Sequence, residues 1–153
     1  MPEGSSGRQG RAVGVDLGAR RIGVAVSDSA GTMALPRLTL ERTGDPEVDR
    51  RRLADIVVEE GAVVVVVGLP LSLDGTRGPA ALAAVDEAEA LGSLLAAHGI
   101  AVELYDERLT TVTAHQTLTT TRGNERARRP VVDQAAAAVL LEAWLAWRQR
   151  GDR

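Results

Sequence analysis

The feature that most constrains the fold is an uninterrupted run of five valines, Val63 to Val67, in the middle of the chain. Consecutive β-branched residues favour a strand, and the absence of polar alternation predicts that both faces of this strand are buried. A sheet that contains such a strand needs a layer of helices on each side. We therefore expect a three-layer α/β domain.

The N-terminal part of the chain carries the signals of a β-hairpin. Segments 12–18 and 22–28 are short and apolar, and the three residues between them are typical of a tight turn. Segment 33–40 predicts a third strand, which Pro36 makes irregular or places at an edge of the sheet.

Helix signals alternate with strand signals in the rest of the chain. Asp45 followed by Pro46 is typical of a helix N-terminus, and Gly61 predicts the end of that helix. The final helix is apolar nearly all round, which predicts a central position in the fold. The other expected elements, in chain order, are a helix over 78–97, a strand over 100–105, a short helix from Thr110 or Thr111 to about Leu118, a polar loop over 119–130 and the final helix from Pro130 to Trp147.

Together these elements predict a mixed five-stranded sheet with helices on both faces. The length of 153 residues suits one domain. We expect that domain over 11–148, after a disordered, Gly- and Ser-rich tail over 1–10 and before a short C-terminal tail over 149–153.

Composition excludes several kinds of site. The chain has no cysteine and only two histidines, so a thiol nucleophile, a disulfide framework and a Cys- or His-rich metal site are excluded. A metal ion would be held by oxygen ligands, which suits Mg²⁺ or Mn²⁺. The sequence also lacks a long apolar run and a secretory signal, so we expect no membrane association and a cytoplasmic location.

Charge is distributed unevenly along the chain. The formal net charge of −3 argues against a protein that coats nucleic acid non-specifically. The predicted loop over 119–130 nevertheless carries four arginines and one glutamate. This loop is either a clamp on a nucleic acid backbone or simply a solvated segment.

Four carboxylates stand where an acidic side chain needs an explanation. Asp16 lies inside an apolar strand, Asp106 and Glu107 directly follow another strand, and Asp133 begins an apolar helix. Each has an ordinary structural interpretation: Asp16 as the start of a turn, Asp106 or Glu107 as a solvated strand end, and Asp133 as a partner of the helix dipole.

Considered together, these carboxylates favour a common site. The strands and the helix that carry them can converge in a three-layer domain, and three carboxylates without Cys or His are typical of a hard divalent metal site. Two such ions, about 4 Å apart, activate a water and stabilise the leaving oxygen of a phosphodiester.

The chain resembles the YqgF family of pre-16S rRNA nucleases, which are also described as Holliday-junction-resolvase-like proteins. The similarity covers about 11 to 147. The most specific blocks are the Asp-x-Gly hairpin and the Asp-Glu-Arg-Leu-Thr-Thr sequence, and the matching segments are 15–18, 21–28, 67–71 with 74–75, 106–111 and 133–136.

The resemblance implies an RNase H-like fold and a metal-dependent endonuclease that matures the 5′ end of 16S rRNA or resolves branched DNA. It implies Asp16, Glu107 and Asp133 as catalytic residues, and the same three with Asp106 as ligands of two Mg²⁺ or Mn²⁺ ions. The fourth strand ends without an acid, so the second carboxylate must come from Asp106 or Glu107.

A further set of residues is expected to contact the substrate. Gly18 allows close approach of a phosphate, and the basic and hydroxyl side chains donate hydrogen bonds to it, although the two threonines are equally well explained as helix caps. The complete set is Gly18, Arg20, Arg21, Arg108, Thr110, Thr111, Arg126 and Arg128.

Several alternatives stay open from the sequence. An Asp-x-Gly hairpin also occurs in ATP-binding domains, but those need two such domains, and this chain has no Walker motif. A noncatalytic scaffold that binds nucleic acid is the second alternative. The sequence does not decide between RNA and DNA, nor between a monomer and a homodimer.

Overall fold

The computed structural model describes the fold of residues 10–110 and 125–151, and side-chain surroundings for 10–110 and 132–151. Its five-stranded sheet has the strand order β3-β2-β1-β4-β5. The strands are β1 (Arg11–Leu17), β2 (Arg21–Ser27), β3 (Ala34–Glu41), β4 (Ala62–Leu69) and β5 (Ala101–Asp106). The helices are α1 (Pro46–Glu59), α2 (Pro79–Leu95) and α4 (Glu125–Gly151), with 3-10 turns η2 (Ala96–His98) and η3 (Glu107–Leu109).

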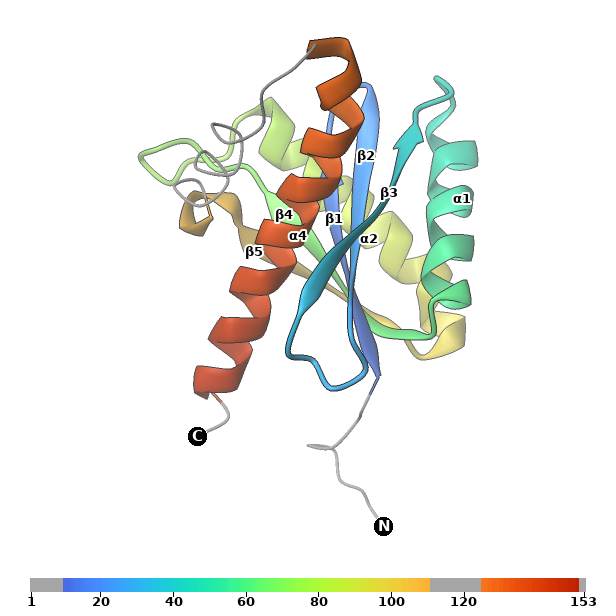
Figure 1. Ribbon diagram of the computed structural model, residues 1–153. Coiled ribbons are helices and arrows are strands. Elements are labelled where there is room, and N and C mark those ends of the chain that lie inside the picture. The colour runs from blue at the N-terminus through green and yellow to red at the C-terminus, as the bar shows by residue number, and fades with distance from the viewer. Residues whose placement is uncertain (1–9, 111–124, 152–153) are drawn as a thin grey trace.

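The sheet is mixed, as expected. β1 pairs antiparallel with β2 and parallel with β4, and β5 continues the parallel half of the sheet. Helices α1 and α2 cover one face and α4 crosses the other, so the three-layer arrangement is confirmed (Figure 1).

The valine run forms the middle of β4 and separates two apolar cores. Val65 and Val67 pack into the core under α1 and α2, whereas Val64 and Val66 pack into the core under α4. All four side chains are buried. Burial on both faces is therefore what this run of residues provides.

Strand β3 lies at an edge of the sheet, where the sequence placed it. Its register with β2 shifts between two consecutive residues of β2, because Leu38 lies opposite Val24 while Pro36 lies opposite Ala25. A proline donates no backbone hydrogen bond, so an irregular edge strand accommodates it at little cost.

Helix α1 begins as its first residues predict. The carboxylate of Asp45 accepts a hydrogen bond of 3.0 Å from the backbone N–H of Glu47, and Pro46 occupies the first helical position. Gly61, with a positive φ of 71°, follows the helix C-terminus. Within the described residues, none of the helices is both long enough and apolar enough to cross a membrane.

Two boundaries of the last helix differ from the sequence prediction. Helix α4 begins at Glu125 rather than Pro130, so the second half of the predicted loop is helical. The residues before the proline are mostly Glu, Arg and Ala, which are strong helix formers, and one lost hydrogen bond at Pro130 does not end the helix. The helix also continues to Gly151, so the start of the predicted tail over 149–153 is wrong. The short helix expected before the loop, and the loop up to residue 124, lie outside the described residues.

Candidate active site

The candidate site is built around Asp16 and two glycines that flank it in the sheet. Gly23 of β2 lies directly opposite Asp16 of β1. Val15 of β1 pairs with Val67 of β4. Asp16 follows Val15 and Gly68 follows Val67, so Asp16 and Gly68 lie side by side on neighbouring strands. Because the small residues of these strands face α4, the three positions form a row across the sheet on the α4 side.

Gly23 lets helix α4 bring Asp133 onto this row. A Cβ atom added at Gly23 would collide with the backbone carbonyl of Asp133 and would lie 3.2 Å from the Cβ atom of that residue. Any side chain at position 23 would therefore push α4 away from the sheet. The glycine places Asp133 over the strand that neighbours Asp16.

Gly68 plays the equivalent part for Glu107. An added Cβ atom at Gly68 would overlap the carboxylate of Glu107 and would lie 2.9 Å from its Cγ atom. The side chain of Glu107, which follows β5, thus folds back across β4 toward β1. It occupies the space that a side chain at the end of β4 would otherwise fill.

The electrostatics show that these carboxylates sense one another. Burial, and then the charge of Asp133, raise the pKa of Asp16 to about 6. Burial raises the pKa of Glu107 to about 7, with contributions from Asp16 and Asp106. The pKa of Asp133 is also raised by burial, while Arg21 opposes the shift. Asp16 is thus within electrostatic range of Asp133 on one side and of Glu107 on the other.

Asp106 has a different environment from Glu107. Its carboxylate accepts hydrogen bonds from the backbone N–H and the guanidinium of Arg108, at 2.9 Å and 2.7 Å respectively. These bonds hold its pKa below the usual range. Asp106 also serves as the N-cap of η3. The geometry thus favours Glu107 over Asp106 as the second carboxylate of the site.

The turn between β1 and β2 is closed by hydrogen bonds that the sequence did not reveal. The N–H of Gly18 donates to the carbonyl of Arg21 at 2.9 Å, and a Cβ atom at Gly18 would lie 2.6 Å from that carbonyl oxygen. The guanidinium of Arg42 donates to the carbonyl of Gly18 at 2.7 Å. Gly18 is therefore required for the turn itself, whatever it does for a substrate.

The arginines predicted to contact the substrate differ in their surroundings. Arg20 is exposed at the β1–β2 turn. Arg21 lies near Asp133, and its Nε atom is buried without a hydrogen bond and 3.6 Å from the carboxylate of Glu41. Arg108, in contrast, is engaged by Asp106 and donates to the carbonyl of Leu73.

Thr110 acts as a cap in this structure. Its hydroxyl donates to the carbonyl of Glu107 at 2.9 Å, and its side chain is buried. This contact is at the C-terminal end of η3, so it differs from the helix N-cap expected from the sequence, and the helix that Thr110 was expected to begin lies outside the described residues. Thr111 and the side chains of Arg126 and Arg128 lie outside the described residues.

The three carboxylates are suitable ligands for a divalent cation, but they do not form a complete coordination site. Within the described residues, no three acidic or histidine side chains lie close enough together to hold an ion. Three desolvated carboxylates with raised pKa values are nevertheless the donor set that a Mg²⁺ or Mn²⁺ ion would stabilise, since its charge offsets their repulsion.

Comparison with known proteins places the chain in a family. The model of a family described as the Holliday junction resolvase RuvX matches residues 10–147. The chain belongs to this RuvX (YqgF) family. A relative from Leifsonia xyli subsp. xyli is 47% identical over 135 residues, which cover 88% of this chain and 84% of the relative. A relative from Rhodococcus opacus is 48% identical over 145 residues, covering 93% and 80%. Both are named "Putative pre-16S rRNA nuclease".

Solved structures share the fold of the RuvX family member. T. thermophilus RuvC in complex with a Holliday junction substrate aligns with a TM-score of 0.58 at 15% identity, covering 91% of this chain and 95% of that one. The yeast mitochondrial Holliday junction resolvase Ydc2 aligns with a TM-score of 0.57 at 12% identity, covering 91% and 79%. The RNase H-like fold expected from the sequence is thereby confirmed.

Three residues of the site escaped the sequence prediction. The sequence patterns give no role to Gly23, Gly68 or Arg42. A glycine inside an apolar strand marks a place where another group approaches closely, so this signal was available for both glycines. Nothing in the sequence links Arg42 to the hairpin turn.

Proposed function

We propose that the domain over 11–148 is a metal-dependent endonuclease and that its substrate is the precursor of 16S rRNA. The observation that carries the proposal is that Glu107, after β5, and Asp133, on α4, both extend toward Asp16 on one face of the sheet. The names of relatives at 47% and 48% identity support the choice of substrate. Ribosomal precursors are cytoplasmic in bacteria, and we propose the same location here.

In this proposal the three carboxylates hold two Mg²⁺ or Mn²⁺ ions. When bound, the ions supply an activated water and charge stabilisation for the departing oxygen of the phosphodiester. Asp16 extends from a strand between two others, which fixes its position. Glu107 and Asp133 approach it from opposite sides, over Gly68 and Gly23.

Arg21 is the residue best placed to meet the phosphate group. It lies close enough to Asp133 to lower the pKa of that carboxyl, and its side chain is 23% exposed although the Nε atom is buried beside Glu41. A guanidinium at this position binds the non-bridging oxygens of a phosphate. Arg20 is exposed on the same turn and adds positive charge next to Arg21.

Cleavage of branched DNA is the second candidate function. The family description and the fold shared with T. thermophilus RuvC favour it. A symmetric cut of a four-way junction requires two sites, and therefore a homodimer, whereas cleavage of an RNA end is compatible with a monomer.

The test compares Asp16→Asn with wild type on two labelled substrates, with Mg²⁺ or Mn²⁺ present. One substrate is an RNA that spans the 5′ end of precursor 16S rRNA, and the other is a four-way DNA junction. We expect cleavage of the RNA to fall by about 10²–10³-fold or more in the variant, because charge stabilisation in the transition state is lost. Asp55→Asn, the same change at an exposed position of α1, is the matched control.

Each other outcome has a clear meaning. Cleavage of the junction alone, lost in Asp16→Asn, supports the resolvase function instead. Equal behaviour of wild type and Asp16→Asn on both substrates refutes the metal-nuclease mechanism. A noncatalytic scaffold then takes its place if the RNA is still bound.

A further inference from the structure

The few aromatic residues of this chain gather at one place on the α4 face of the sheet. The sequence has two tryptophans, one tyrosine and no phenylalanine. Trp144 is buried, and its indole N–H donates to the carboxylate of Glu103 at 3.0 Å. The rings of Tyr105 and Trp147 lie 6.2 Å apart with an interplanar angle of 56°. Trp147 is 51% exposed, so the pair presents aromatic surface to solvent.

This aromatic pair continues the row of site residues across the sheet. Tyr105 of β5 pairs with Gly68 of β4, and Gly68 lies beside Asp16. Tyr105 packs against the core under α4, so it is on the same face as the carboxylates. Two strand spacings, roughly 10 Å, separate the backbones at positions 16 and 105. The exposed ring of the pair lies farther from the acids, because Trp147 follows Asp133 by 14 residues on α4, which is roughly 21 Å along the helix axis.

We propose that Tyr105 and Trp147 form a stacking site for an unpaired nucleobase of the substrate. The inference rests on the proposed nuclease function and adds to it a contact with a base at some distance along the strand from the cleaved phosphodiester. Aromatic side chains bind bases of any sequence through their faces, so this site would favour single-stranded over fully paired nucleic acid.

The surroundings of the pair suit a nucleic acid strand. Among the residues that the structure describes, β5 is the last strand of the sheet and no further strand pairs with its outer edge. Arg148 lies over the ring of Trp144 at 5.0 Å and is itself exposed, as is Arg150. Positive charge next to an exposed indole attracts the phosphate backbone that accompanies a stacked base.

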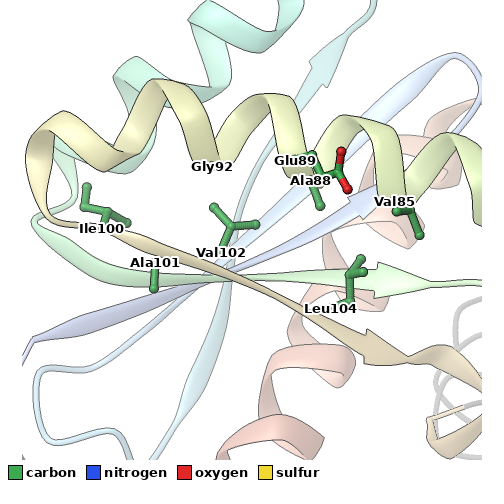
Figure 2. Close-up of a pocket in the computed structure, with 8 residues that line it drawn as sticks. All are labelled: Val85, Ala88, Glu89, Gly92, Ile100, Ala101, Val102 and Leu104. Carbon is green, nitrogen blue, oxygen red and sulfur yellow. The ribbon is translucent and has the colours of Figure 1, made fainter.

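The opposite face of β5 offers a contrast. A shallow groove there, between α2 and β5, is lined by aliphatic side chains and by Glu89 (Figure 2). It contains no aromatic ring, and the carboxylate of Glu89 would repel a phosphate. The features that suit a nucleobase are therefore confined to the α4 side.

The experiment measures binding without cleavage, in EDTA, by fluorescence anisotropy. The probes are a labelled single-stranded RNA and the same strand with abasic residues throughout, which keeps the charge and removes the bases. The proteins are wild type, Trp147→Ala, Trp147→Phe and Leu82→Ala. Leu82 is 53% exposed on α2 and serves as the matched control for loss of an exposed apolar side chain.

We expect wild type to bind the complete strand about tenfold or more tightly than the abasic strand, as loss of one stacked base predicts. Trp147→Ala should lose most of this preference, while Trp147→Phe and Leu82→Ala should keep it. Quenching of tryptophan fluorescence by the RNA should disappear in Trp147→Phe, because the other tryptophan is buried.

An unchanged preference for bases in Trp147→Ala refutes the stacking site but leaves the nuclease proposal intact. Failure of every protein to bind either strand refutes the stacking site and counts against nucleic acid as the substrate. Cleavage that depends on Asp16, combined with equal binding of both strands, again refutes only the stacking site.

Discussion

The two faces of the central sheet are built from residues of different size. Toward α1 and α2, strands β1 and β2 present valine and isoleucine side chains, among them Val13, Val15 and Val24. Toward α4 the same strands present the small residues and one acid, namely Ala12, Gly14, Asp16, Gly23 and Ala25. Because side chains alternate along a strand, one sequence specifies both surfaces.

The difference shows how α4 can bring an acidic side chain close to the sheet. The bulky side chains of β1 and β2 pack in one core with the buried side chains of α1 and α2. Glycines let the backbone of α4 approach the sheet so closely that added Cβ atoms at Gly14 and Gly23 would collide with it. Close approach on this face brings Asp133 within range of the charge on Asp16.

The largest effect is expected from Gly23→Ala, which tests this close approach. The new Cβ atom would collide with the backbone of Asp133, which cannot move without the helix. We expect a loss of about 2–3 kcal/mol in the free energy of unfolding, measured with urea, and loss of metal-dependent cleavage. A variant with wild-type stability would show that α4 is not held in place by the glycine.

Gly68→Ala tests the same idea where the neighbour is a flexible carboxylate. Here the added atom meets the end of the Glu107 side chain, which can rotate away. We therefore expect a change of less than about 1 kcal/mol in stability but a 10–100-fold fall in kcat, because a misplaced catalytic group costs about that much. Equal losses of stability in Gly68→Ala and Gly23→Ala would contradict the distinction between side chain and backbone.

The pH dependence of stability tests the electrostatic cost of the α4 face. Folding raises the pKa of Asp16 from 3.8 to about 6 and that of Glu107 from 4.5 to about 7. The metal-free native state therefore binds more protons than the unfolded state, and its stability falls as the pH rises from about 4 to 7. At pH 8, Asp16→Asn should increase the free energy of unfolding of the metal-free protein by on the order of 1–3 kcal/mol, which is measured as a higher Tm. The difference in stability between variant and wild type should shrink at pH 5.

Addition of Mg²⁺ or Mn²⁺ provides the companion measurement. A metal that binds only the native state should raise the Tm of wild type at pH 8 and should have little effect on Asp16→Asn. If Asp16→Asn were less stable than wild type at pH 8 without metal, the ionised carboxylate of Asp16 would not destabilise the native state as proposed.

The smallest effect is expected from Gly92→Ala on the opposite side of the sheet. Gly92 lies inside α2, and an added Cβ atom would meet its nearest neighbour, Val102, at 3.9 Å, an ordinary contact. Alanine is the better helix former by about 1 kcal/mol, so this variant should be slightly more stable with unchanged cleavage. Thermal unfolding of both variants should show a higher Tm than wild type for Gly92→Ala and a lower Tm for Gly23→Ala.

The sequence by itself determined the three-layer fold, because the valine run at 63–67 has to be buried on both sides and turn and cap residues mark most element boundaries. It also singled out Asp16, Asp106, Glu107 and Asp133, since acids next to apolar segments need a reason to be there, and left open whether Asp106 or Glu107 joins the site. Those signals are local, and each is read from a few consecutive residues.

Only the tertiary structure decided which groups approach one another. That Glu107 lies over Gly68, that Asp133 lies over Gly23 and that Arg108 is held by Asp106 depend on packing between segments far apart in the chain. The start of α4 at Glu125 likewise reflects a helix that tolerates Pro130. Local patterns fix what a segment can form, whereas strand register and helix approach fix the distances on which catalysis depends.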